Sequence, residues 1–185
     1  LSIIVIFCDK DYKYINDLYN NLKSNIVNYE YETIFVSNCE NITVPSTLYG
    51  YRVYSTGDNY YCLAGRKEGL KYATGDYVWF VDADDSIQRT DLKVDGDPDI
   101  VAFRFWRFYD DGKLNYVFPK MSRQTIKGAD CFSEKTYLEI HCAMWNKWYK
   151  RSFITSIYDK FPDRLKIVDH EDCLINLIAL KYALY

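Results

Sequence analysis

The chain has 185 residues, 49% of them hydrophobic and 26% charged, with a formal net charge of −3. This length allows one substantial hydrophobic core, so a single domain is expected. Acidic and basic residues are interspersed without a Lys/Arg block, which argues against a nucleic-acid partner, and no apolar window of 18 residues or more predicts a membrane span.

The first half predicts alternating strands and helices. Leu1–Phe7 is rich in Ile and Val, as in a strand buried on both faces, and neither a basic segment nor a cleavage site marks it as a secretion signal. Because the chain lacks a starting Met and begins inside this strand, we expect it to be trimmed. The other predicted elements are a helix from Tyr12 to Ile26, strands Thr33–Ser37, Tyr51–Tyr54 and Tyr77–Val81, and a helix through Leu63, Leu70 and Ala73 that Gly75 ends as a C-cap.

The resulting order predicts an α/β fold with a mostly parallel sheet. Ligands of such sheets bind beyond the carboxyl ends of the strands. This rule places Phe7–Asp9, Ser37–Asn38 and Asp82–Asp85 along one rim of the sheet.

The second half is less regular. Alternation predicts one long strand over Asp99–Tyr109, with a turn at Asp110–Lys113 leading into a strand over Leu114–Phe118. Helices are expected over Gly128–Ile140, over Phe153–Tyr158, and from Glu171 to the end; the apolar face of the last is assigned to Leu174, Leu177, Ile178 and Tyr182. The six cysteines stand singly, which favours reduced thiols over disulfides.

Three carboxylates follow the strand at Tyr77–Val81. Asp82, Asp84 and Asp85 repel one another unless a cation or hydrogen-bond donors neutralise them. Mg²⁺ or Mn²⁺ would do so, completing its shell with phosphate oxygens and water. Bound to a diphosphate, such an ion stabilises a negative leaving group. The alternative is an acidic turn without function.

A second acidic pair, Glu171 and Asp172, opens the last predicted helix. Negative charge is favoured at a helix N-terminus, so a capped helix explains the pair without any chemistry. The functional interpretation is a general base that takes a proton from an attacking hydroxyl group. His170 is expected to be a capping residue rather than a metal ligand.

Aromatic residues supply candidates for binding a sugar acceptor. Those between Phe103 and Tyr109 alternate on a predicted strand and are expected to belong to the core. Trp145 and Lys147, in a Trp- and Lys-rich segment, are the better acceptor candidates.

One long ordered pattern resembles family 2 glycosyltransferases of the GT-A fold. It comprises Asn59, Ala64-Gly65-Arg66, Gly69-Leu70, Ala73-Thr74-Gly75-Asp76-Tyr77 and the aspartate cluster, and Ser2–Val5 and Trp145–Arg151 also fit. The resemblance implies a Rossmann-like sheet flanked by helices. It also implies a nucleotide-binding half (1–86) and an acceptor-binding half (87–185) of one domain.

The resemblance implies a role for each matching residue. Arg66 helps to hold the nucleotide, Asp82 with Ala83 lies near the ribose, and Asp84 binds the metal, with Asp85 as a second ligand. Base and ribose lie against Ile6, Phe7 and Cys8. Asp172 is the catalytic base beside Glu171.

Some positions depart from the family pattern. Ile6–Asp9 replaces the usual Pro-x-Tyr-Asn, and Lys67 replaces the asparagine of Ala-Arg-Asn. Asn38 stands where an aspartate normally pairs with uracil, and an amide can accept that hydrogen bond or pair with another base. UDP is the first expectation for the donor nucleotide.

The predicted function is an inverting, metal-dependent transfer of sugar from a nucleotide-sugar donor to a glycan or lipid-linked acceptor in bacterial surface-polysaccharide or lipopolysaccharide assembly. We also expect a cytoplasmic location, peripheral contact with the inner membrane, and a homodimer. One alternative is a nucleotidyltransferase, although Cys8–Lys13 lacks the glycine-rich loop of that class. Another is a degenerate domain that only binds a sugar or a partner.

Overall fold

The structure is a computed structural model that describes residues 1–39, 44, 46–48, 51–57, 61–88, 94–103, 105–108, 114–118, 125–140, 142–163, 165, 167 and 170–183. Its six-stranded sheet has the order β3-β2-β1-β4-β8-β5, and β6 and β7 form a separate pair. The strands are β1 Ser2–Phe7, β2 Glu32–Ser37, β3 Val53–Ser55, β4 Tyr77–Asp82, β5 Ile100–Ala102, β6 Phe105–Phe108, β7 Leu114–Phe118 and β8 Lys147–Lys150. The helices are α1 Tyr12–Asn25, α2 Tyr61–Leu70, α3 Glu134–Ile140, α4 Arg151–Tyr158 and α5 Glu171–Tyr182.

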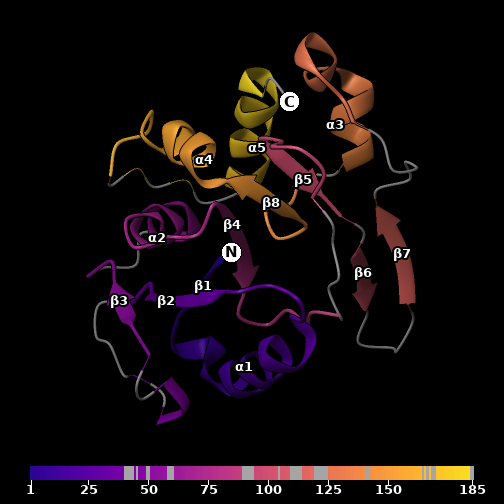
Figure 1. Ribbon diagram of the computed structural model, residues 1–185. Helices are drawn as coiled ribbons and strands as arrows, with labels where there is room; N and C mark the ends of the chain where they lie inside the picture. The colour runs from indigo at the N-terminus through magenta and orange to yellow at the C-terminus, as the bar shows by residue number, and fades with distance from the viewer. Residues whose placement is uncertain are drawn as a thin grey trace.

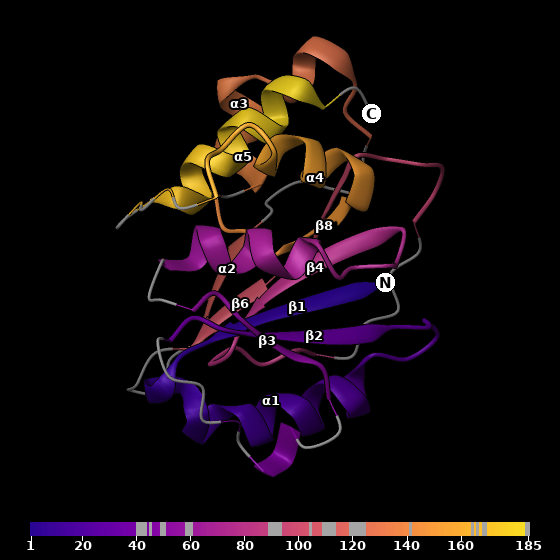
Figure 2. The same cartoon turned by 90° about the vertical axis from the view of Figure 1, so that its left-hand side faces the viewer.

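Helices cover both faces of the sheet, with α1 on one side and α2, α4 and α5 on the other (Figures 1 and 2). Successive side chains of a strand point to opposite faces, and β1 is buried along its whole length. Ile4 and Ile6 therefore join the core under α2, α4 and α5, whereas Ile3 and Val5 join the core under α1. This architecture confirms the α/β prediction.

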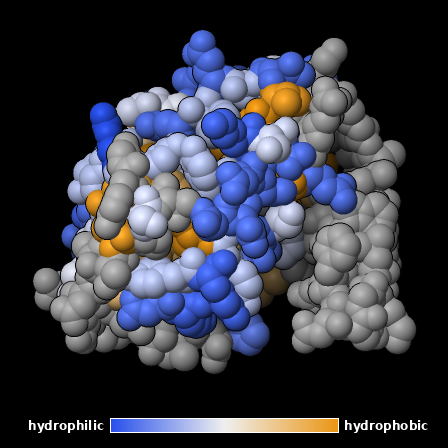
Figure 3. Space-filling view, turned by 90° about the horizontal axis from the view of Figure 1, so that it is seen from below, coloured by the Kyte–Doolittle hydropathy of each residue, from blue (hydrophilic) through white to orange (hydrophobic). Residues whose placement is uncertain are grey.

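Helix α1 shows how the sequence pattern sets the layers. Its inward residues Ile15, Leu18 and Leu22 are spaced by three or four positions and are buried. Polar residues such as Asn16 and Asp17 lie on the opposite, exposed side. The residues that are coloured by hydropathy in Figure 3 are mostly hydrophilic, with small separate apolar patches. Among the described residues, no helix has both the length and the apolar character needed to cross a membrane.

Strands β1, β2, β3 and β4 run parallel, whereas β8 lies antiparallel between β4 and β5. Register partners at the carboxyl ends are Phe7 with Ser37 and Ile6 with Asp82. The predicted rim therefore exists, because three parallel strands end side by side. The strand character of Lys147–Lys150 was not predicted.

The predicted apolar face of α5 is wrong at three of its four positions, and the fourth, Ile178, is partly buried against the core. Leu174, Leu177 and Tyr182 are 38%, 42% and 49% exposed, whereas Ile175, Asn176, Ala179 and Leu180 are buried. Both sets have helical spacing, and packing against α4 and β8 selects the second. The buried set includes an asparagine, which hydropathy alone would place outside.

Three smaller predictions also need correction. The single strand over Asp99–Tyr109 is two strands, β5 and β6, which belong to different sheets. The third strand begins at Val53 rather than Tyr51, and the predicted turn at Asp110–Lys113 lies outside the described residues. Helix α2 ends at Leu70, so Gly75 is not its C-cap: a Cβ at Gly75 would lie 2.8 Å from the backbone of Leu1 and of Ser2.

Gly69 allows α2 to pack closely on the sheet, and replacing it by Ala is expected to destabilise the protein. The added Cβ would lie 2.5 Å from Cγ2 of Ile4, in the middle of the buried strand β1. Overpacking of this kind costs about 1–3 kcal/mol, to be measured as the free energy of unfolding in urea. Gly65→Ala is the control, because its Cβ would meet Cγ2 of Ile6 at 3.1 Å and the side chain needs only a small shift. Equal losses in the two variants would contradict this account.

Candidate functional site

The ends of β1 and β2 form one part of the rim. The Asn38 N–H donates to Phe7 O at 2.9 Å, which ties the first residue after β2 to β1. Oδ1 of Asn38 accepts a hydrogen bond from Thr56 Oγ1 at 3.1 Å, so the predicted base-pairing side chain is held in place. Ile6, Phe7 and Asn38 are buried, and Cys8 is partly buried.

Cys8 turns the chain away from β1 toward α1. Its N–H and its thiol both contact Asp11 Oδ2, at 2.9 Å and 3.1 Å. Burial, together with the Asp11 carboxylate, raises the pKa of the Cys8 thiol to about 11, so the thiol is neutral at physiological pH. Asp11 therefore holds Cys8 where the chain leaves β1 at this rim.

The aspartate cluster follows β4 in a tight turn. The Asp85 N–H donates to Asp82 O at 3.1 Å, which brings the carboxylates of the turn close together, and Asp84 is exposed. Burial and the neighbouring Asp82 and Asp84 raise the pKa of Asp85 to about 7. Ala83 is buried beneath the turn.

The donor chemistry of this turn fits a hard divalent cation held by one or two carboxylates. Ionised Asp85 is disfavoured by burial and by its acidic neighbours, and a cation at the turn would relieve both effects. Within the described part of the chain, no three His, Cys, Asp or Glu side chains gather in a geometry that would hold a metal by themselves. A cation bound at this turn would therefore also need water or phosphate oxygens as ligands.

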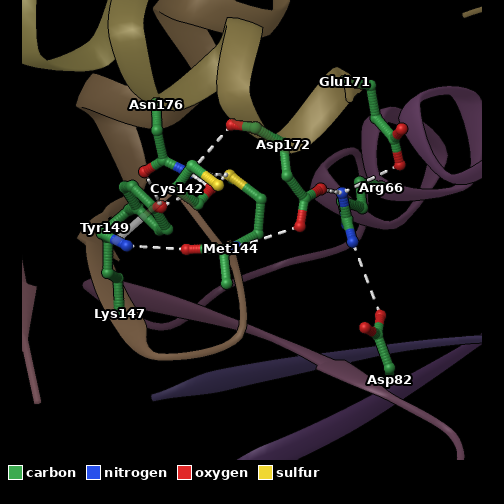
Figure 4. Close-up of polar contacts among 10 residues, drawn as sticks. Arg66, Asp82, Cys142, Met144, Lys147, Tyr149, Glu171, Asp172 and Asn176 are labelled. Atoms are coloured by element: carbon green, nitrogen blue, oxygen red, sulfur yellow. Dashed lines mark hydrogen bonds and ion pairs between the residues drawn. The ribbon is translucent and has the colours of Figure 1, made fainter. Parts of the chain in front are cut away.

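Arg66 connects the turn to the second acidic pair (Figure 4). Its guanidinium lies 3.4 Å from Asp82 Oδ1 and 3.6 Å from Glu171 Oε1, and it donates to Asp172 Oδ1. The arginine side chain is only 2% exposed. The three carboxylates are thus gathered around one buried cation that α2 supplies.

Asp172 lies in the first turn of α5, with its carboxylate held from two sides. Oδ1 accepts from Arg66 and Oδ2 accepts from the Met144 N–H at 3.2 Å. Asn176, one turn further along α5, donates to Asp172 O at 2.9 Å and to Cys142 O. His170 is exposed in a left-handed conformation, φ 62°, and makes no side-chain cap hydrogen bond.

The two predicted acceptor residues differ in exposure. Trp145 is partly exposed, and its carbonyl accepts a 2.6 Å hydrogen bond from Trp79 Nε1. Lys147 is fully buried, and its Nζ donates to Ala143 O at 2.6 Å and to Asn146 Oδ1 at 2.7 Å. Burial lowers the pKa of Lys147 to about 7. An acceptor cannot reach this ammonium group in the described conformation, so its role is inside the protein.

A known family model matches most of the chain. The model for "Glycosyl transferase family 2" matches residues 2–158, which include β1, the aspartate turn and β8. The chain belongs to glycosyl transferase family 2. The prediction of the family is thereby confirmed.

Solved structures share the fold of this family 2 chain. S. aureus TarS 1–349 matches with a TM-score of 0.71 at 21% identity, and its complex with UDP matches with 0.74, also at 21% identity. Each alignment covers 98% of this chain and 55% of that one, so the chain spans about half the length of these neighbours. The similarity confirms the GT-A architecture. No curated protein matches in sequence.

Sequence reasoning missed the residues that surround Asp172. The Met144 N–H is a backbone group and leaves no signature in a sequence. Asn176 does leave one, because it is a polar residue on the side of an otherwise apolar helix, four positions after Asp172. Its helical spacing from Asp172 predicts that the two share a face.

Proposed function

We propose that the chain is an inverting glycosyltransferase that takes a sugar from a nucleotide-diphosphate donor, with UDP-sugar as the first choice. The single observation that supports this most is the joining of Asp82 and Asp172 by Arg66. The guanidinium lies between the acidic turn after β4 and the acidic start of α5. Transfer of a glycosyl group needs both a leaving-group side and a base side.

On the donor side, the nucleotide would lie along the rim formed by Ile6–Cys8 and Asn38, with Arg66, Asp82 and Ala83 beside its ribose and phosphates. Asp84 and Asp85 would hold Mn²⁺ or Mg²⁺, which when bound neutralises the departing diphosphate. Two crystal structures of the neighbour TarS contain UDP and UDP-GlcNAc, which supports UDP as the nucleotide. UDP-GlcNAc is therefore the first donor to test.

On the acceptor side, Asp172 would take the proton from the attacking hydroxyl group. The oxygen of that hydroxyl group would form the new glycosidic bond as the bond to the diphosphate breaks. Attack from the face opposite the diphosphate inverts the anomeric carbon, and no covalent enzyme intermediate forms. Glu171, 3.6 Å from Arg66, adds negative charge beside the base. Trp145 offers a partly exposed aromatic face for stacking an acceptor sugar. We assign the acceptor to the glycans or lipid-linked sugars of bacterial surface polysaccharides.

Calorimetric titration of UDP, GDP and CDP, each with and without Mn²⁺, tests the donor site. We expect UDP to bind in the presence of Mn²⁺, and Asp84→Asn to weaken this binding about tenfold or more, because a metal ligand loses its charge. Asp163→Asn is the control, since Asp163 is an exposed carboxylate paired with Lys67. If well-folded protein binds none of the nucleotides, the transferase proposal fails and a sugar- or protein-binding domain remains.

A further inference from the structure

One peptide group lies between Lys147 and Asp172. The Ala143–Met144 peptide accepts a hydrogen bond from Lys147 Nζ at its carbonyl oxygen, 2.6 Å away. The N–H of the same peptide donates to Asp172 Oδ2 at 3.2 Å. Figure 4 shows Lys147, Met144 and Asp172 in this arrangement. An ammonium group and a carboxylate therefore face opposite ends of one peptide dipole.

The neighbouring residues hold this peptide in place. Asn146 Nδ2 donates to Ile140 O at 3.1 Å, and Asn176 Nδ2 donates to Cys142 O. Both asparagines are buried, at 0% and 1% exposure. The segment before β8 is thus fixed at Ile140, Cys142 and Ala143, so the Met144 N–H cannot rotate away from Asp172 without breaking a buried hydrogen bond.

The physical effect of Lys147 on Asp172 follows from this geometry. A cation that bonds to a carbonyl oxygen polarises the peptide and makes its N–H a stronger donor, and hydrogen bonds in series reinforce one another at low dielectric. The Asp172 carboxylate in turn raises the pKa of Lys147, opposing the lowering by burial. The two groups are therefore electrostatically coupled although they make no direct contact that the structure describes.

We propose that Lys147 is a positioning residue for the catalytic base: acting through the Ala143–Met144 peptide, it orients the Asp172 carboxylate and stabilises its negative charge. This inference rests on the proposed function, which makes Asp172 the base. It assigns to the buried lysine of the Trp-Asn-Lys segment a role in the reaction that needs no contact with substrate.

The test compares Lys147→Met, which removes both charge and donor, with Lys147→Gln, which keeps a donor without charge. Lys67→Met is the matched control: its Nζ also bonds a backbone carbonyl, that of Phe161, but its carboxylate partner is Asp163. The assay is UDP release from UDP-GlcNAc with water as acceptor, in Mn²⁺. We expect kcat to fall about tenfold in both Lys147 variants, with calorimetric UDP affinity unchanged and Lys67→Met like wild type.

The pH profile separates this role from a structural one. Loss of the positive charge removes an electrostatic stabilisation of the negatively charged base, so we expect the acidic limb of kcat to move to higher pH in both Lys147 variants. The other groups facing Lys147 are Cys142 and Cys173. Those facing Asp172 are Arg66, Cys62, Tyr158 and Tyr149, together with Asp82 at the end of β4 and Glu171 of the same helix turn. Asp172 is the carboxylate whose charge acts on Lys147, so the limb is compared between variants that all keep Asp82 and Glu171. The pKa values of Cys62, Cys142 and both tyrosines are raised, chiefly by burial, and none of these groups titrates in acid.

Unchanged kcat and an unchanged acidic limb in a folded Lys147 variant would overturn the inference. Failure of the proposed function looks different: wild type would then release no UDP, or Asp172→Asn would be fully active. If neither Lys147 variant folds, NMR of the wild type decides. The ¹⁵N chemical shift of the Met144 amide should change with pH at the same midpoint as the ¹³Cε shift of Lys147. A Met144 shift that does not change at this midpoint would exclude the coupling.

Discussion

Replacing Arg66 by Met is expected to lower the free energy of unfolding by about 3–5 kcal/mol, because it leaves clustered carboxylates without their cation. The guanidinium is 2% exposed and contacts Asp82, Glu171 and Asp172. The burial of Arg66 is compensated by these acids, and their mutual repulsion is compensated by Arg66. Urea denaturation followed by circular dichroism measures the loss.

Two further variants isolate the electrostatic part of this effect. In Arg66→Met combined with Asp172→Asn, one of the unpaired charges is gone, so the loss should be smaller than in Arg66→Met alone. Arg151→Met is the control for loss of an arginine, since Arg151 is exposed and donates to Gly75 O at 2.8 Å. We expect Arg151→Met to lower the free energy of unfolding by about 1 kcal/mol. A loss that small in Arg66→Met would show that the acids do not need the guanidinium.

Asp172→Asn is expected to reduce kcat for UDP release from UDP-GlcNAc by about 100- to 10,000-fold, the range for removal of a general base. The amide is nearly the same size as the carboxylate, and its oxygen can still accept a hydrogen bond from Arg66 or from the Met144 N–H. Binding of UDP should therefore change little, because only the proton acceptor is lost. Steady-state kinetics gives kcat, and calorimetry on the same preparations gives the affinity for UDP.

Glu171 provides the comparison for this variant. Its Oε1 lies 3.6 Å from Arg66, whereas the Asp172 carboxylate accepts two hydrogen bonds, one from Arg66 and one from the Met144 N–H. Glu171→Gln should therefore reduce kcat much less than Asp172→Asn. If Glu171→Gln is the more damaging of the two, the base has been assigned to the wrong carboxylate.

The first half of the fold was predictable because its signals are local. Buried strands such as Leu1–Phe7 and Tyr77–Val81 are visible in the sequence as continuous apolar runs. The amphipathic helix between Tyr12 and Ile26 is visible because its apolar residues recur at helical spacing. The apolar face of α5 was not predictable from the same signal. Leu174 and Leu177 form one apolar set at helical spacing, and Ile175 and Ala179 form another. The second set is buried because it packs against the rest of the protein, which the sequence of α5 alone does not specify.

The candidate site was predictable as a set of residues but not as an arrangement. Motifs indicated Arg66, Asp82 and Asp172 separately, and their meeting depends on contacts between α2, β4 and α5. Lys147 illustrates the reverse difficulty. A lysine between tryptophans is expected at the surface. Lys147 is instead buried, and the hydrogen bonds that its Nζ donates to Ala143 O and Asn146 Oδ1 compensate for the burial.

The position of β8 has a consequence for the order of folding during synthesis. Strand β4 lies between β1, which precedes it in the chain, and β8, which follows much later, with Trp79 opposite Trp148. A nascent chain that has only reached Asp82 can pair β4 with β1, but the other edge of β4 stays open. Exposed edges of apolar strands attract other chains, and distant pairings form slowly. The ribosome-bound intermediate is therefore vulnerable to aggregation until Lys147–Lys150 emerges and completes the sheet.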